Sequence, residues 1–148
     1  MSWDNETKLP QACYASTGIE YKKKIYLFGG ISNHGLQKKA WTYDLETKKW
    51  VAMKNLPNIR NYMSCEIWND NIYLLGGWGI DIELMSVKTP QVLKYSIIEN
   101  KWYFETELPR ALTNIATCIY DNSLYVLGGM TKKKEFTKYI TVSLAFRY

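Results

Sequence analysis

The sequence predicts an all-β protein made of three tandem repeats, and three regularities support this prediction. Four β-forming residues followed by two glycines occur three times, which is typical of a buried strand that ends where no Cβ fits. A Leu-Pro pair precedes each run, and its proline is always 19 positions before the first glycine. A tryptophan lies six positions before each of these leucines. The runs are residues 25–30, 72–77 and 124–129, the leucines are Leu9, Leu56 and Leu108, and the tryptophans are Trp3, Trp50 and Trp102.

The first complete unit spans residues 11–57 and follows a short segment, residues 1–10, that matches only the end of the later units. We expect this segment to form a single outer strand. Within the unit, apolar or alternating runs predict strands, and the polar or lysine-rich stretches between them predict turns. The expected strands cover residues 11–21, 25–28, 40–45 and 50–56.

Residues 58–109 repeat this plan, and residues 110–148 repeat most of it. The middle unit carries a five-residue insertion before its third strand, and such insertions often mark the functional side of a repeat array. In the last unit Tyr139 aligns with Tyr95, and Phe146 takes the position of a tryptophan. Because Tyr148, two residues later, is the last residue, we expect the fourth strand of this unit to be largely missing. The expected strands cover 62–68, 72–75, 92–97 and one from 102 onward, then 113–120, 124–127 and 136–140.

Composition indicates a cytosolic protein that holds no cofactor. The chain has 47% apolar residues without an 18-residue apolar run, and its first residues do not resemble a secretory signal. The net charge of +5 is interrupted by an acidic middle unit, which argues against a nucleic-acid-binding stripe. Cys13, Cys65 and Cys118 are expected to be reduced core residues, and the absence of a CxxC pair argues against zinc.

Double glycine, tyrosine and tryptophan at these spacings, in units of about 50 residues, resemble the kelch repeat. The resemblance implies a partial β-propeller of about three four-stranded antiparallel blades. The family often carries an arginine near the first strand, and here Arg60 alone matches it. Richness in Asn, Ile, Lys and Tyr is similar to poxvirus kelch-like proteins, and from the start of the sequence within a repeat we expect no BTB domain in this chain. The aromatic residues expected to fill the wedge between blades are Tyr43, Trp50, Tyr95 and Trp102.

The resemblance also implies a ligand face made by the loops after the double glycines and by the loops that enter each first strand. Trp78 and Arg60 are the first candidates, because tryptophan and arginine are enriched at binding hot spots. The alternatives are that Trp78 packs under its own loop, residues 78–90, and that Arg60 makes structural hydrogen bonds to loop carbonyls. The full candidate set is Arg60, Asn61, Tyr62, Trp78, Ile31, Met130 and His34.

Three functions are compatible with these features. The first is a non-enzymatic module that binds an unidentified protein through the loop face, as the substrate-binding part of a viral adaptor does. The second is a propeller-type enzyme, which the single histidine and the lack of a nucleophile motif disfavour. The third is a degenerate gene product without a selected activity. Three blades are also expected to form an open arc whose uncovered faces favour self-association.

Overall fold

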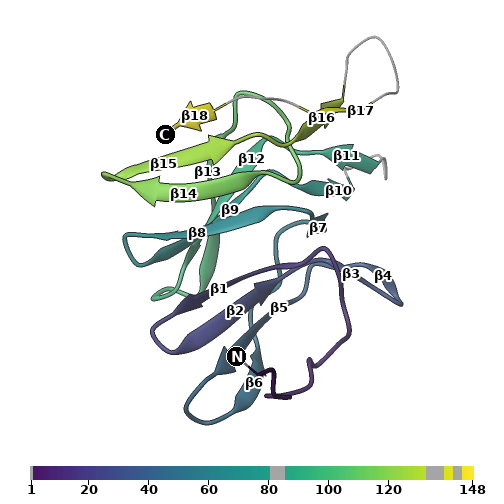
Figure 1. Cartoon of the computed structure of the whole chain (residues 1–148), viewed down its shortest axis with the longest axis vertical. Coiled ribbons are helices and arrows are strands. Elements are labelled where there is room, and N and C mark those ends of the chain that lie inside the picture. Colours follow the sequence, from purple (N-terminus) through teal and green to yellow (C-terminus); the bar gives the residue numbers. More distant parts are fainter. Residues whose placement is uncertain (1, 81–85, 133–138, 142–144) are drawn as a thin grey trace.

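The computed structural model describes residues 2–80, 86–132, 139–141 and 145–148, and its regular structure within these ranges consists of strands alone. Three antiparallel sheets follow one another in chain order, with the first at the bottom of Figure 1 and the last at the top. Each sheet is one blade of the partial propeller that the sequence predicts. The all-β fold class is therefore confirmed.

Blade 1 and blade 2 are complete four-stranded sheets. Blade 1 contains β1 (Thr17–Tyr21), β2 (Lys24–Phe28), β5 (Ala40–Asp44) and β6 (Lys49–Ala52), in the order β1-β2-β5-β6. Blade 2 contains β8 (Ser64–Trp68), β9 (Asn71–Leu75), β12 (Gln91–Ser96) and β13 (Lys101–Glu107), in the order β13-β12-β9-β8. The strands match the predicted ones within a few residues, except that β1 begins six residues later. The chain before it lies along the loop face, where Tyr14 and Ile31 exchange two backbone hydrogen bonds of 2.9 and 2.8 Å.

Blade 3 contains β14 (Ala116–Tyr120), β15 (Ser123–Leu127) and β18 (Ala145–Arg147). The prediction that residues 136–140 form its third strand is wrong. Residues 136–138 lie outside the described ranges, and β17 (Tyr139–Thr141) pairs with β16 (Met130–Lys132) away from the blade. Strand β18 takes the place next to β15 instead, and Tyr148 exchanges backbone hydrogen bonds of 3.1 and 2.9 Å with Leu124. Tyr148 is thus the counterpart of Tyr95, which pairs with Ile72 in blade 2.

Residues 2–10 form no strand, contrary to the expected outer strand. They run exposed beside β6, at the bottom of Figure 1, and Trp3 is fully exposed. Glu6 of the segment accepts hydrogen bonds from the Tyr43 hydroxyl and from Lys48 of blade 1. No neighbouring sheet in the described part of the chain covers this side of blade 1, so the segment is not held between two blades as β13 is.

Each blade carries a hairpin between its second and third strands, and all three hairpins lie on the same side of the molecule, the right side of Figure 1. We call this side the loop face. The hairpins are β3 (Ile31–Ser32) with β4 (Gly35–Leu36), β10 (Trp78–Ile80) with β11 (Ser86–Lys88), and β16 with β17. The short strand β7 (Arg60–Asn61) adds to the middle hairpin by pairing with β10.

The two cores lie between the blades, because strand β9 contributes residues to both of its faces. Ile72 and Leu74 pack in the core with blade 1, whereas Tyr73 and Leu75 pack in the core with blade 3. All four side chains are buried, as alternation along a strand covered on both faces requires. Burying each one stabilises the fold by roughly 1.5–3 kcal/mol.

The outer faces of blades 1 and 3 have no sheet packed on them within the described residues. Tyr43 is buried there because Trp50 and Glu6 cover it. The ring centroids of Tyr43 and Trp50 are 5.0 Å apart. On blade 3, Leu127 and Cys118 are exposed. The prediction that all three cysteines are core residues is therefore wrong for Cys118, although Cys65 is buried.

Two tryptophans at the same repeat position have different surroundings. Trp102 is 9% exposed in the core between blades 1 and 2, where its ring and that of Phe28 lie edge to face with their centroids 5.7 Å apart. Its indole N–H donates to the carbonyl oxygen of Lys54 at 3.2 Å. Trp50 is only half-buried on the outer face of blade 1. The wedge role predicted from the repeat thus appears in Trp102, while blade 1 offers Trp50 no second sheet.

The first two double glycines lie in contact with the backbone of the following repeat and donate hydrogen bonds to it. The Gly30 N–H donates to the Arg60 carbonyl oxygen at 3.0 Å, and the Gly77 N–H donates to the Leu112 carbonyl oxygen at 2.8 Å. A Cβ at position 76 would lie 2.4 Å from the same Leu112 oxygen, and the φ of Gly76 is +60°. A side chain is therefore excluded both by the backbone conformation and by the neighbouring carbonyl.

We predict that Trp102→Ala lowers the free energy of unfolding by about 3–5 kcal/mol, since it removes a buried aromatic side chain. Trp50→Ala serves as the matched control and should cost clearly less, because Trp50 packs against one sheet only. Denaturant unfolding of both variants measures the difference. Equal losses would show that the two sites are energetically alike.

We predict that Gly76→Ala destabilises the fold by about 1–3 kcal/mol more than Gly35→Ala, because its methyl group overlaps a neighbouring carbonyl. Gly35 also has a positive φ, +93°, but a Cβ there has nothing within 4 Å. The control therefore contains the backbone strain without the clash. Thermal or denaturant unfolding gives both values, and an equal loss in the two variants would refute the packing role of Gly76.

Candidate interaction site on the loop face

Three of the predicted site residues line one hollow on the loop face between blades 2 and 3. Tyr62 follows β7, Trp78 begins β10 and Met130 begins β16. The hollow has a volume of about 230 Å³. Its remaining walls are Lys88, Thr113 and Asn114.

A backbone ladder holds this hollow in place. The Tyr62 N–H donates to the Ala15 carbonyl at 2.9 Å, and the Asn114 N–H donates to the Tyr62 carbonyl at 3.0 Å. The three residues stand five positions after the successive Leu-Pro prolines, and each has a positive φ of 52–55°. The ladder fixes the entry of each unit against the previous one, so Tyr62 is presented from a rigid backbone.

The aromatic side chains of the hollow are half-buried and close together. The ring centroids of Tyr62 and Trp78 are 6.5 Å apart at an interplanar angle of 31°. The Asn114 side-chain amide lies 3.5 Å from the sulfur of Met130 on the opposite wall. The alternative that Trp78 packs under its own loop, residues 78–90, stays open, because residues 81–85 of that loop lie outside the described ranges. The side of Trp78 toward Tyr62 and Met130 borders the hollow.

Arg60 is fully buried and does not border the hollow. Its guanidinium donates to the backbone carbonyl of Gln91 at 3.0 Å and to the Gln91 side-chain oxygen at 3.1 Å. Burial lowers the pKa of Arg60 to about 10, because a low-dielectric surrounding disfavours the charged form. Arg60 therefore remains protonated at neutral pH, and these contacts support the structural alternative stated for it.

Asn61 is also buried, at 1% exposure, which differs from the expected contact with a partner. The cause is strand β7, whose residues Arg60 and Asn61 pair with Gly79 and Trp78 of β10. Both side chains are buried, and the Arg60 guanidinium is directed to Gln91 of blade 2. Arg60 and Asn61 thus support the wall that carries Trp78 and do not form its surface.

Ile31 and His34 belong to the hairpin of blade 1 and do not line the hollow. Ile31 is half-buried through its bridge to Tyr14, and His34 is exposed at the hairpin tip. The His34 backbone N–H donates to the Ser32 hydroxyl at 3.0 Å, which shapes the turn. These two residues share the loop face with the hollow but form a separate surface.

Three wall residues were not predicted from the sequence. Asn114 could have been found, because it occupies the same repeat position as Tyr62. Thr113 follows from the same alignment, since it matches Asn61. Lys88 lies late in the long loop, where no repeat marker stands. Burial lowers the pKa of Lys88, as expected for a cation that is partly withdrawn from water.

Over the described residues no helix is long and apolar enough to cross a membrane. A family model described as the KLHDC2/KLHL20/DRC7 kelch-repeats domain matches residues 1–145. The chain is 27% identical over 132 residues to the kelch repeat and BTB domain-containing protein 2 of cowpox virus (strain GRI-90 / Grishak), covering 88% of this chain and 22% of that protein. It is 26% identical over 136 residues to alpha-scruin of Limulus polyphemus, covering 87% of this chain and 14% of that protein.

Further similarity links the chain to kelch repeat protein C2 of vaccinia virus (strain Western Reserve), at 27% identity over 122 residues, 80% of this chain and 22% of that protein. The chain thus spans about a fifth or less of the length of these relatives. The solved structure of YjhT shares the fold, with a TM-score of 0.75 and 23% identity over 84% of this chain and 36% of the other. Because the family model covers nearly all of the repeat pattern described above, the chain belongs to the kelch-repeat family.

Proposed function

We propose that this chain is a non-enzymatic protein-interaction module that holds its partner at the hollow between blades 2 and 3. The observation that carries the proposal is the convergence of Tyr62, Trp78 and Met130 around one hollow on the loop face. Aromatic and methionine side chains are enriched in the buried centres of protein interfaces. Loops on a rigid scaffold are also where binding residues concentrate.

The walls of the hollow suggest the chemistry of the segment that would enter it. The two aromatic rings and the thioether offer apolar contact, whereas Lys88 supplies positive charge and Thr113 and Asn114 supply hydrogen-bonding groups. A loop or peptide with an apolar side chain next to a carboxylate fits this combination. Burial of Lys88 strengthens its attraction for such a carboxylate, because screening by water is reduced.

The named relatives support a protein partner. The name of the cowpox virus relative combines kelch repeats with a BTB domain, and the vaccinia virus relative is a kelch repeat protein. We infer that this chain corresponds to the partner-holding part of such a kelch-like adaptor. The enzyme alternative gains no specific observation from the geometry of the hollow.

We predict that Trp78→Ala weakens binding to the partner by at least ~2 kcal/mol without loss of fold, as for other tryptophan hot spots. Cross-linking and mass spectrometry from host-cell lysate would identify the partner, and calorimetry with the purified pair would measure affinity. Phe104→Ala is the matched control, because Phe104 is an exposed aromatic side chain on β13, outside the hollow. Equal partner affinity of wild type and Trp78→Ala would show that the binding site lies elsewhere. Failure to identify a reproducible partner would favour the alternative of a degenerate gene product.

We predict that Arg60→Ala acts on stability and not specifically on binding. It removes two buried charge-assisted hydrogen bonds, which costs about 1.5–3 kcal/mol, while the Gln91 carbonyl keeps the Gly76 N–H and the Gln91 side-chain oxygen keeps the Asn58 amide as a donor. Denaturant unfolding tests the loss. An Arg60→Ala variant with unchanged stability and reduced partner affinity would restore Arg60 as a direct contact residue.

A further inference from the structure

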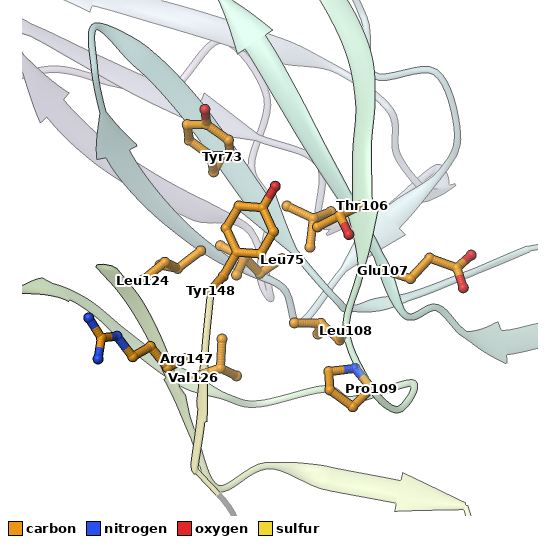
Figure 2. Close-up of a pocket in the computed structure, with 11 residues that line it drawn as sticks. Tyr73, Leu75, Thr106, Glu107, Leu108, Pro109, Leu124, Val126, Arg147 and Tyr148 are labelled. Carbon is orange, nitrogen blue, oxygen red and sulfur yellow. The ribbon is translucent and has the colours of Figure 1, made fainter. Parts of the chain in front are cut away.

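A cavity of about 340 Å³ lies between blades 2 and 3, on the side where blade 3 ends with β18. Figure 2 shows the Tyr148 ring across its mouth, with Leu75, Leu108 and Val126 around it. An apolar cavity of about 150 Å³ already admits a benzene molecule, so this one has room for an indole ring. The cavity lies apart from the hollow on the loop face, because the two share no lining residue.

The repeat identifies which side chain the cavity would take. At the interface between blades 1 and 2, Trp102 packs on Phe28 and Tyr95, with ring centroids 5.7 and 4.8 Å away, and donates to the Lys54 carbonyl. The same repeat positions at the next interface are those of Leu75, Tyr148 and Thr106, and all three line the cavity. The cavity is therefore the counterpart of the Trp102 site.

The edge of blade 3 is suited to the strand that would bring such a tryptophan. In blades 1 and 2 a fourth strand pairs with β5 and β12, placing Trp50 opposite Tyr43 and Trp102 opposite Tyr95. In the described part of the chain, β18 pairs with β15 alone. A strand added along β18 would place its tryptophan opposite Tyr148, over the cavity.

The segment of residues 3–10 carries the matching sequence. Trp3 and Leu9-Pro10 have the spacing of Trp102 and Leu108-Pro109 at the end of the middle unit. Leu56 and Leu108 are 2% and 8% exposed in the two cores, whereas Leu9 is 44% exposed and Trp3 is 101% exposed. The segment therefore leaves outside the core the two apolar side chains that the corresponding strands bury.

Charge also agrees with this register. In blade 2 the Lys94 ammonium lies 2.8 Å from the Glu105 carboxylate. The corresponding residues on β18 and on the segment are Arg147 and Glu6, which again have opposite charges. At present Glu6 contacts Lys48 and Tyr43, and Glu6 and Lys48 are more than half exposed, so releasing the ion pair costs little.

We propose that residues 3–10 of a second copy of this chain form the fourth strand of blade 3, with Trp3 in the cavity. Because residue 10 leads directly into blade 1, the exchange packs blade 1 of the donor copy against the outer face of blade 3. A reciprocal exchange joins the three described blades of one copy and those of the other into one closed ring. Six blades lie within the usual range of propellers, about four to eight.

The same copy does not present its segment to this edge. Residues 2–10 lie beside β6, at the bottom of Figure 1, whereas β18 lies at the top, next to β15 in the third sheet. An exchange between copies also covers the half-buried Leu27 and Trp41 on the outer face of blade 1. The exchange thus fills the cavity and covers both outer faces of each copy, through two equivalent junctions related by a twofold axis.

The first experiment compares wild type, Trp3→Ala and the control Ile98→Ala by sedimentation over a range of concentrations. Ile98 is an 87% exposed apolar residue in the turn between β12 and β13, so its removal deletes apolar surface away from the cavity. We expect a dimer for wild type and Ile98→Ala, and at least tenfold weaker dimerisation for Trp3→Ala. Circular dichroism at a concentration where all three are monomeric would show the same strand content, since Trp3 is exposed in the single copy.

A second experiment tests register by exchanging charges. Glu6→Arg and Arg147→Glu should each weaken dimerisation, and the doubly substituted chain should recover most of it. A peptide of residues 1–10 should bind Trp3→Ala protein, whereas the same peptide with alanine at position 3 should not.

A monomeric wild type, or a Trp3→Ala variant that dimerises like wild type, would overturn the proposal. Open polymers that depend on Trp3 would support strand exchange and overturn ring closure, and Trp78→Ala should leave dimerisation unchanged.

Discussion

The contact on which the rest of the structure depends joins the first two double glycines, Gly29-Gly30 and Gly76-Gly77, to the backbone of the following repeat. Gly30 donates to the Arg60 carbonyl and Gly77 to that of Leu112, and the first glycine of each pair leaves no room for a Cβ beside the same oxygen. The contact brings the start of each new blade to the end of the second strand of the previous blade. Each blade is therefore stacked on the one before it, as the three sheets of Figure 1 show.

This spacing creates two interfaces that differ in what fills them. The interface between blades 1 and 2 is closed by Trp102, while the interface between blades 2 and 3 contains a cavity of about 340 Å³. Packed interiors tolerate few voids of this size, because atoms that line a void lose their dispersion contacts. The middle blade, covered on both sides, is the best-buried part of the protein, and the two outer blades are its incomplete neighbours.

The loop face depends on the same geometry. Tyr62 reaches the hollow because its carbonyl and N–H link the entries of three successive units, and Met130 reaches it because blade 3 packs on blade 2. Arg60 is buried behind the hollow, and its guanidinium donates hydrogen bonds to Gln91, the first residue of β12. A surface built from two blades in this way is sensitive to substitutions in the inter-blade cores as well as in the loops.

The sequence by itself determined the all-β repeat, the strands of the first two blades and the residues Trp78 and Met130 after the double glycines, because strand propensity and turn chemistry act locally. Tertiary structure alone decided the burial of Arg60, since its guanidinium is held by Gln91, 31 positions along the chain. It also decided that β18, and not residues 136–140, completes blade 3, because local patterns do not specify long-range pairing. Likewise Trp50 and Trp102 have equivalent repeat positions, and only the presence of a neighbouring blade makes one of them a core residue.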